Sequence, residues 1–92
     1  MIDVRDNPQL SRYEIHADGE RVGFVNYTRR GDVITFVHTE VDPAHEGHGY
    51  AGTLVAAALD DVRSRGLTVI AQCQYVSKFI REHDEYADLL TV

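Results

Sequence analysis

The sequence predicts a mixed α/β (α+β) fold in which an antiparallel meander precedes a parallel strand-helix-strand crossover and a short C-terminal helix. Three observations predict this fold. β-rich runs separated by turn residues fill residues 1–41, a glycine-rich loop follows them, and a helical run then lies between two strand-like runs. The 92 residues, of which 43% are hydrophobic, are predicted to form one domain over residues 1–92.

The meander is predicted from the N-terminal half of the chain. Residues 1–10 alternate poorly and contain Asn7-Pro8, so we expect a short edge strand or a lead-in. Two β-rich runs, Tyr13 to Ala17 and Arg21 to Thr28, flank Asp18-Gly19, which is a dipeptide typical of hairpin turns. Both runs are therefore expected to pair as antiparallel strands.

A third strand is predicted over Val33 to Val41, after a turn at residues 30–32. Its side chains are expected to alternate between the two faces of the sheet, because a strand has a period of two residues. One face would carry Ile34, Phe36, His38 and Glu40, and the other would carry Val33, Thr35, Val37, Thr39 and Val41.

The crossover is predicted over the second half of the chain. Apolar residues recur at helical spacing from Tyr50 to Arg65, and Gly66 is a natural helix stop. Leu67 to Cys73 is strand-like, and a helix between two strands makes the pair parallel. A short helix is expected from Val76 to His83, and Tyr86 to Val92 is expected to be a last strand or a docked tail.

Composition narrows the class of function and the compartment. The net charge of −6 argues against nonspecific nucleic-acid binding, because no basic stripe is present to displace counterions from phosphates. The single cysteine forms no internal disulfide, so nothing points to an oxidising compartment. The N-terminal residues lack the apolar core of a signal peptide, and no run approaches membrane-spanning length. We expect a cytoplasmic protein with no nucleic-acid or membrane partner.

The stretch from Val41 to Gly52 joins the third predicted strand to the helix. Its glycines, Gly47, Gly49 and Gly52, permit sharp turns and close approach to the backbone. Backbone amides at a helix N-terminus are unpaired, and the helix dipole adds partial positive charge, so a phosphate or pyrophosphate could bind there. Glycine-rich turns also occur as plain connectors, and the P-loop pattern is not matched, because no Lys-Ser/Thr pair follows the glycines.

The six residues Glu46-Gly47-His48-Gly49-Tyr50-Ala51 resemble the Arg/Gln-x-x-Gly-x-Gly/Ala signature of the GNAT superfamily of N-acetyltransferases. The resemblance extends through DPAHEGHGYAGTLVAAALDDVRSRGL, a short strand ending in Cys73, and QYVSKFIREHDEYADL. This order is similar to the small single-domain, YjdJ-like subfamily, and it covers nearly the whole chain. Glu46 departs from the signature, so only backbone contacts to phosphate are implied at that position.

The resemblance implies that the chain binds acetyl-CoA. In the family, the loop amides hold the pyrophosphate, and the pantetheine arm lies between two diverging parallel strands and bonds to strand backbone. Lys78, with Arg81 one helical turn away, could meet the adenosine phosphates of CoA or belong to an ordinary solvated face. The implied cofactor-binding residues are Thr39, Val41, Glu46, Gly47, His48, Gly49, Tyr50, Ala51, Gly52 and Lys78.

Acetyl transfer needs a neutral amine and a protonated or stabilised leaving thiolate, and several residues are candidates for this chemistry. Cys73 is either a nucleophile that relays the acetyl group or a small buried hydrophobic residue. His38 is the candidate general base, or a partly buried histidine satisfied by a hydrogen bond. Tyr75 or Tyr86 could protonate the thiolate, although packing is the commoner role of a tyrosine.

We expect an N-acetyltransferase that uses acetyl-CoA and acts on an amine that the sequence does not identify: a protein lysine, a polyamine or a small-molecule amine. The alternative is a noncatalytic acyl-CoA-binding or sensing module, because the early helices that commonly shape an acceptor pocket in the family are missing. A plain interaction domain with a connector loop is a third class.

No metal site is predicted, because His45, His48 and Cys73 match no zinc spacing. Both a monomer and a homodimer are compatible with an open-edged sheet.

Overall fold

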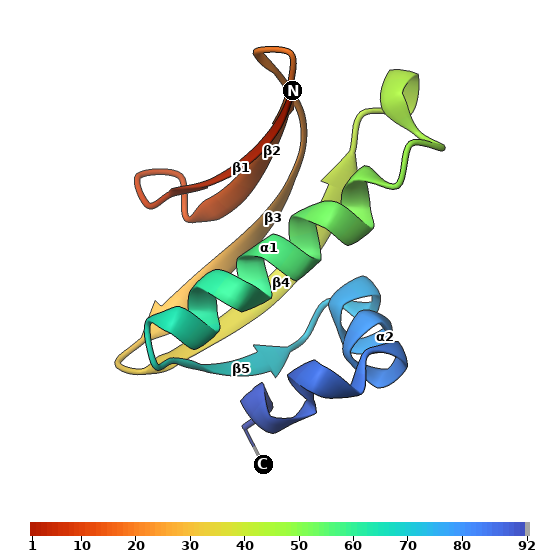
Figure 1. Ribbon diagram of the computed structural model, residues 1–92. Coiled ribbons are helices and arrows are strands. Elements are labelled where there is room, and N and C mark those ends of the chain that lie inside the picture. Colours follow the sequence, from red (N-terminus) through yellow and green to blue (C-terminus); the bar gives the residue numbers. More distant parts are fainter. Residues whose placement is uncertain (92) are drawn as a thin grey trace.

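The computed structural model describes residues 1–91, which form five strands, two α-helices and two short 3₁₀ helices (Figure 1). The strands are β1 (Ile2–Asn7), β2 (Arg12–Ala17), β3 (Glu20–Arg30), β4 (Val33–Val41) and β5 (Thr68–Ala71). The helices are η1 (Pro43–His45), α1 (Tyr50–Ser64), α2 (Gln74–Glu82) and η2 (Asp84–Leu89). None of the described helices is long and apolar enough to cross a membrane.

The strands form one sheet whose spatial order follows the chain order, β1-β2-β3-β4-β5. The first four strands pair antiparallel, and β4 pairs parallel with β5 across the α1 crossover. The hairpin between β2 and β3 turns at Asp18-Gly19, where both residues have the positive φ that a type I′ turn requires (52° and 87°). The predicted meander, its edge strand β1 and the parallel crossover are confirmed.

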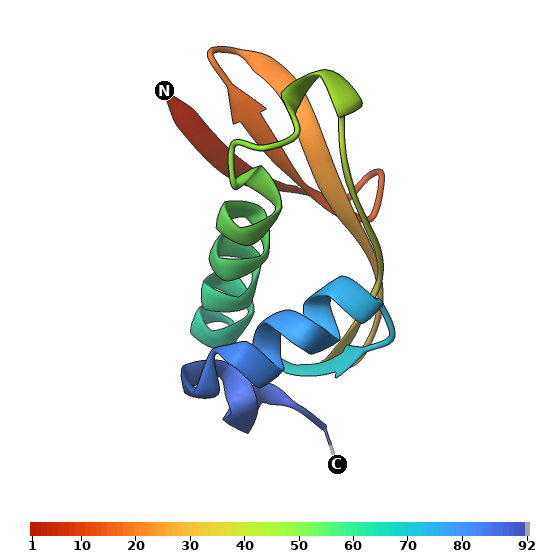
Figure 2. The ribbon, with the colours of Figure 1, turned by 90° about the vertical axis from the view of Figure 1, so that its right-hand side faces the viewer.

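Both α-helices pack on one face of the sheet, and the core lies between them and the strands (Figure 2). α1 turns an apolar stripe toward the sheet because its hydrophobic residues recur every three or four positions. The buried stripe consists of Leu54, Val55, Ala58, Leu59 and Val62. From the sheet, the same buried cluster includes Ile15, Val25, Ile34 and Phe36. The opposite face, which we call the outer face, is covered by no helix in the described part of the chain.

A β-bulge in β4 changes which of its side chains share a face. The β3 residues that face His38 and Phe36 are adjacent in sequence, so Val37 is an extra residue in β4. Ile34 and Phe36 are buried in the core, whereas His38 and Glu40 are exposed on the outer face. The prediction that these four residues share one face is therefore wrong, because the bulge shifts the alternation by one residue.

Two predicted boundaries after the crossover also differ from the structure. β5 ends at Ala71 rather than at Cys73, because Cys73 is the N-cap residue of α2. The backbone N–H of Cys73 donates to the carbonyl oxygen of Phe36 (2.9 Å), which ties the start of α2 to β4. α2 consequently begins at Gln74 rather than at Val76.

The C-terminal segment, expected as a last strand or a docked tail over Tyr86 to Val92, docks as the 3₁₀ helix η2. Tyr86 and Leu89 are buried, and the Tyr86 hydroxyl donates to Asp60 on α1 (2.9 Å). Burial and this hydrogen bond raise the pKa of Tyr86 to about 12. Val92 lies outside the described residues.

The outer face carries a buried carboxylate, Glu14 on β2, which is 7% exposed. Burial alone would raise its pKa, but hydrogen bonds with His16, Arg12 and Asn7 (3.0, 2.7 and 3.1 Å) outweigh burial and lower the pKa to about 2. Glu14 therefore joins three other side chains into a polar network on an otherwise uncovered surface.

We expect this network to make the free energy of unfolding depend on pH. A pKa that is lower in the folded state adds stability above the unfolded value of 4.5, and this contribution is lost as the pH falls toward about 2. In urea denaturation, the unfolding free energy of the wild type should fall across this range. The Glu14→Gln protein should be less stable at neutral pH, and its unfolding free energy should decrease less over the same pH range. An equally steep fall in the variant would contradict the assignment.

Candidate functional site

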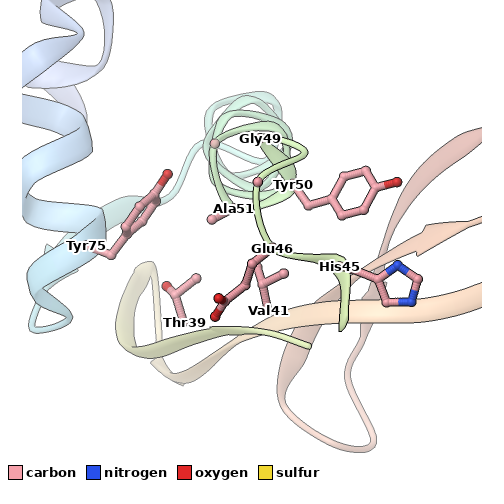
Figure 3. A pocket seen from close by; sticks show the side chains of 10 residues that line it. Thr39, Val41, His45, Glu46, Gly49, Tyr50, Ala51 and Tyr75 are labelled. Carbon is pink, nitrogen blue, oxygen red and sulfur yellow. The ribbon is translucent and has the colours of Figure 1, made fainter. Parts of the chain in front are cut away.

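A cavity lies where β4 and β5 separate. Pairing of the two strands ends at Phe36 and Ala71, and among residues 1–91 no backbone hydrogen bond joins the rest of β4 to β5. The loop after β4 and the first turns of α1 and α2 surround the gap (Figure 3). The cavity has a volume of about 350 Å³ and is lined by Thr39, Val41, His45, Glu46, Gly47, Gly49, Tyr50, Ala51, Gly52 and Tyr75.

The loop wall of this cavity offers backbone donors. Gly49 is the N-cap residue of α1 and has a φ of +73°, a left-handed conformation that favours glycine. No side chain caps the helix, and none of the N–H groups of residues 47–52 donates to another backbone group within residues 1–91. These free donors and the positive end of the helix dipole make the first turn of α1 suitable for an anion.

The strand wall is formed by Thr39 and Val41 of β4. The bulge at Val37 brings both residues to the helix-covered face, where their side chains border the cavity (Figure 3). Thr39 Oγ1 lies 3.3 Å from Cys73 Sγ, and Cys73 is buried. The thiol therefore lies beside β4, close to the point where the two strands stop pairing.

Tyr75, in the first turn of α2, forms the third wall. Its hydroxyl faces the first turn of α1 (Figure 3), where Gly52 leaves room: a Cβ atom at that position would lie 3.6 Å from the hydroxyl. The Tyr75 ring stacks on Phe79, with ring centroids 6.5 Å apart. Burial, and then the nearby Glu82, raise the pKa of Tyr75, so the phenol is protonated at neutral pH. This hydroxyl can donate a proton into the cavity.

Several predicted residues do not line this cavity. His38 is exposed on the outer face, with its ring centroid 6.4 Å from that of Phe24, because the bulge turns it away from the helices. His48 is exposed beside the loop glycines, and Lys78 is exposed on α2. Tyr86, the second tyrosine candidate, is bonded to α1 at Asp60 and does not border the cavity.

His45 lines the cavity, although it was not among the residues that the resemblance singled out. Its position just before the glycines is the only sequence signal for this placement. His45 Nε2 lies 3.5 Å from Glu20 Oε2, and Glu20, Asp42 and His45 each place one potential ligand atom within 4.8 Å of the others. Exposed acidic groups commonly occur without a metal, so this cluster alone does not indicate a metal site.

Comparison with protein families gives one match. Residues 12–89 match a family model described as GCN5-related N-acetyl-transferase. The matched region includes β2 to β5, the cavity-forming loop and both α-helices. Among proteins with curated functions, none matches the chain significantly.

Solved structures share the fold at low sequence identity. A GCN5-like protein from Staphylococcus aureus is 20% identical, with a TM-score of 0.73, over 97% of this chain and 87% of its own. Ribosomal-protein-S18-alanine N-acetyltransferase from Escherichia coli is 18% identical, with a TM-score of 0.62, over 72% of this chain and 43% of its own. PaiA N-acetyltransferase from Thermoplasma acidophilum, solved with coenzyme A, is 14% identical, with a TM-score of 0.61, over 77% and 48%. The chain thus spans less than half the length of the latter two enzymes.

Proposed function

The chain belongs to the GCN5-related N-acetyltransferase family, and we propose that it binds acetyl-CoA between β4 and β5 and transfers the acetyl group to an amine. One observation carries the proposal: free backbone donors at the start of α1 and the unpaired edge of β4 border the same cavity. The donors suit a pyrophosphate, and the strand edge suits an extended arm that contains amides. We propose that this activity belongs to a single domain over residues 1–92.

In this proposal the pyrophosphate accepts hydrogen bonds from the amides of residues 47–52. The pantetheine arm extends along β4 and bonds to backbone beside Thr39 and Val41. The thioester then lies near Cys73, where the strands stop pairing. The Thermoplasma acidophilum relative, which was solved with coenzyme A, supports the choice of ligand.

Three further predicted cofactor contacts lie at the rim. The Glu46 side chain extends from the loop toward β4 (Figure 3), so we propose that it forms part of the pantetheine wall rather than a phosphate contact. His48 and Lys78 are exposed, and we propose that they meet the phosphates of CoA from the solvent side. Removing either side chain should therefore weaken binding much less than a change in the loop backbone.

Acetyl-CoA supplies an activated acetyl group: the acceptor nitrogen bonds to the carbonyl carbon, and the carbon–sulfur bond breaks with its electron pair leaving on sulfur. The nitrogen loses one proton and the sulfur gains one, which gives an N-acetyl product and free CoA. We assign the proton for sulfur to Tyr75, whose protonated hydroxyl borders the cavity. We assign removal of the amine proton to His38, which requires the acceptor to approach from the outer face.

Cys73 distinguishes direct transfer from a relay. In a relay, its thiolate would take the acetyl group first, and the amine would then attack the resulting protein thioester. The thiol is buried and bonded to Thr39, so we propose direct transfer with Cys73 behind Thr39, next to the acetyl position. The Cys73→Ala protein should retain most of its turnover. A loss of about 100-fold, together with acetylation of wild-type Cys73 detected by mass spectrometry, would establish the relay instead.

A noncatalytic acyl-CoA-binding module is the second candidate function, and one observation favours it. β1 and β2 are joined by a tight turn over residues 8–11, so no helix between them shapes an acceptor pocket. Such a module would keep the cofactor cavity and lack turnover.

Calorimetry and an amine screen separate the two functions. We expect the purified protein to bind acetyl-CoA in a calorimetric titration. We also expect it to release CoA, detected by chromatography, when lysine peptides, polyamines or amino acids are supplied. Binding without CoA release across the panel would support the module. The absence of binding by a folded protein would overturn both functions.

A further inference from the structure

A second cavity lies on the outer face of the sheet, opposite the helices. Its volume is about 530 Å³, which exceeds the 350 Å³ of the cavity between β4 and β5. β3, β4 and β5 supply its lining residues, which are Thr28, Arg29, Arg30, Val33, Thr35 and Ile70. The outer cavity therefore combines apolar side chains with hydroxyl and guanidinium donors.

The outer cavity concentrates positive charge in an acidic protein. The chain carries a net charge of −6, yet the only charged residues of this lining are arginines. Arg30 faces Val33 on the outer face, whereas Arg29 faces Ile34 on the helix-covered face and donates to the carbonyl of Gly31 (3.0 Å). Within residues 1–91, Arg30 forms no ion pair. A guanidinium without a carboxylate partner is well suited to bind a carboxylate or a phosphate.

The outer cavity is close to the proposed position of acetyl transfer. Thr35 lines it, and His38 lies on the same face because Val37 is the extra residue of the bulge. The three residue steps from Thr35 to His38 span at most about 10 Å, and the five steps from Val33, which faces Arg30, span at most about 17 Å. Between them, at Phe36, pairing of β4 with β5 ends.

We propose that the outer cavity binds the anionic group of the acceptor, so that the acceptor is a small molecule with a primary amine at one end and a carboxylate or phosphate at the other. The anion pairs with Arg30, and the amine reaches the opening between β4 and β5 beside His38. This inference rests on the proposed acetyl transfer, and it selects anionic amines over polyamines.

Acceptors matched in length test the charge requirement. 5-Aminopentanoate, 5-aminopentyl phosphate and cadaverine carry the same amine on chains of similar length and differ in the charge at the far end. We expect kcat/KM to be at least about 10-fold higher for one of the anions than for cadaverine. Arg30→Gln should remove this preference by raising KM, while the Kd for acetyl-CoA stays unchanged. The control variant Arg5→Gln, on the exposed edge strand β1, should behave as the wild type.

Amide chemical shifts give a readout that does not require turnover. In the protein saturated with CoA, the preferred anion should shift the amides of Thr28, Arg30, Thr35 and Ile70. Equal kcat/KM for the diamine, or no shift at these amides with either anion, would overturn the inference. Retained CoA binding in that case would leave the proposed function standing, whereas a protein that binds no acetyl-CoA would overturn both.

Discussion

The Gly49→Glu protein is expected to fold normally and to lose its affinity for acetyl-CoA. A Cβ atom at position 49 would meet nothing within 4 Å, so the site has room for a Cβ, although a left-handed φ costs a non-glycine residue roughly 1–2 kcal/mol. The new carboxylate would lie among the free amides of residues 47–52 and repel the pyrophosphate, and such like-charge contacts cost several kcal/mol. The Kd measured by calorimetry should therefore rise by at least about 100-fold.

Two control variants separate charge from backbone strain in this experiment. Gly49→Ala introduces the same strained φ without the charge, so it should weaken binding far less. Gly66→Glu introduces the same charge at a φ of +72°, also in open space, but at the other end of α1. It should lower the melting temperature and leave the Kd unchanged. Unchanged affinity in a folded Gly49→Glu protein would remove the loop from the cofactor site.

The Tyr75→Phe protein is expected to bind acetyl-CoA as tightly as the wild type and to turn over about 100-fold more slowly. The substitution removes the hydroxyl that we assign to protonate the leaving sulfur. It keeps the ring, which stacks on Phe79, so the wall of the cavity remains in place. Measuring kcat and the calorimetric Kd on the same preparation distinguishes lost chemistry from lost binding.

The pH profile adds a second test of Tyr75. Because burial raises the pKa of Tyr75 above its ordinary value of 10.0, the phenol stays protonated through neutral pH, and wild-type activity should decline only at more alkaline pH. That decline should be absent from the residual activity of Tyr75→Phe. Tyr86→Phe is the matched control, since its hydroxyl bonds to Asp60 away from the cavity and should affect only stability. Full turnover in Tyr75→Phe would limit Tyr75 to packing.

The elements that border the cavity between β4 and β5 were predictable because their sequence signals are local. β4 spans Val33 to Val41 and α1 begins at Tyr50, both as predicted. Strand alternation, three glycines and a helical spacing of apolar residues follow one another directly along this part of the chain. The family signature lies on the same loop. The sequence therefore predicted residues 47–52, which offer the free amides, as one group.

The faces of β4 could not be predicted from the same alternation. Val37 is β-branched and fits a strand on either face, so nothing in the sequence marks it as an extra residue. Its place in the bulge follows from the register with β3, where adjacent residues face Phe36 and His38. Pairing between two strands therefore decided that His38 lies on the outer face.

The start of α2 was missed for a related reason. Gln74 and Tyr75 precede the apolar residues that reveal the helix, so periodicity alone places the start too late. The actual start follows Cys73, whose N–H is bonded to Phe36 on β4. A tertiary contact thus sets the position of Tyr75 in the first turn of α2, facing α1.

The order of the strands also bears on how the molecule assembles. Because spatial order follows chain order, β2, β3 and β4 can each pair with the strand synthesised just before it. β5 can pair with β4 only after the α1 crossover has been made. Contacts between segments that are distant in sequence form more slowly than contacts between neighbouring strands. We therefore expect the cavity between β4 and β5 to form after the meander. A ligand that binds this cavity binds only chains in which β4 and β5 have paired, so it would shift the folding equilibrium toward the complete fold.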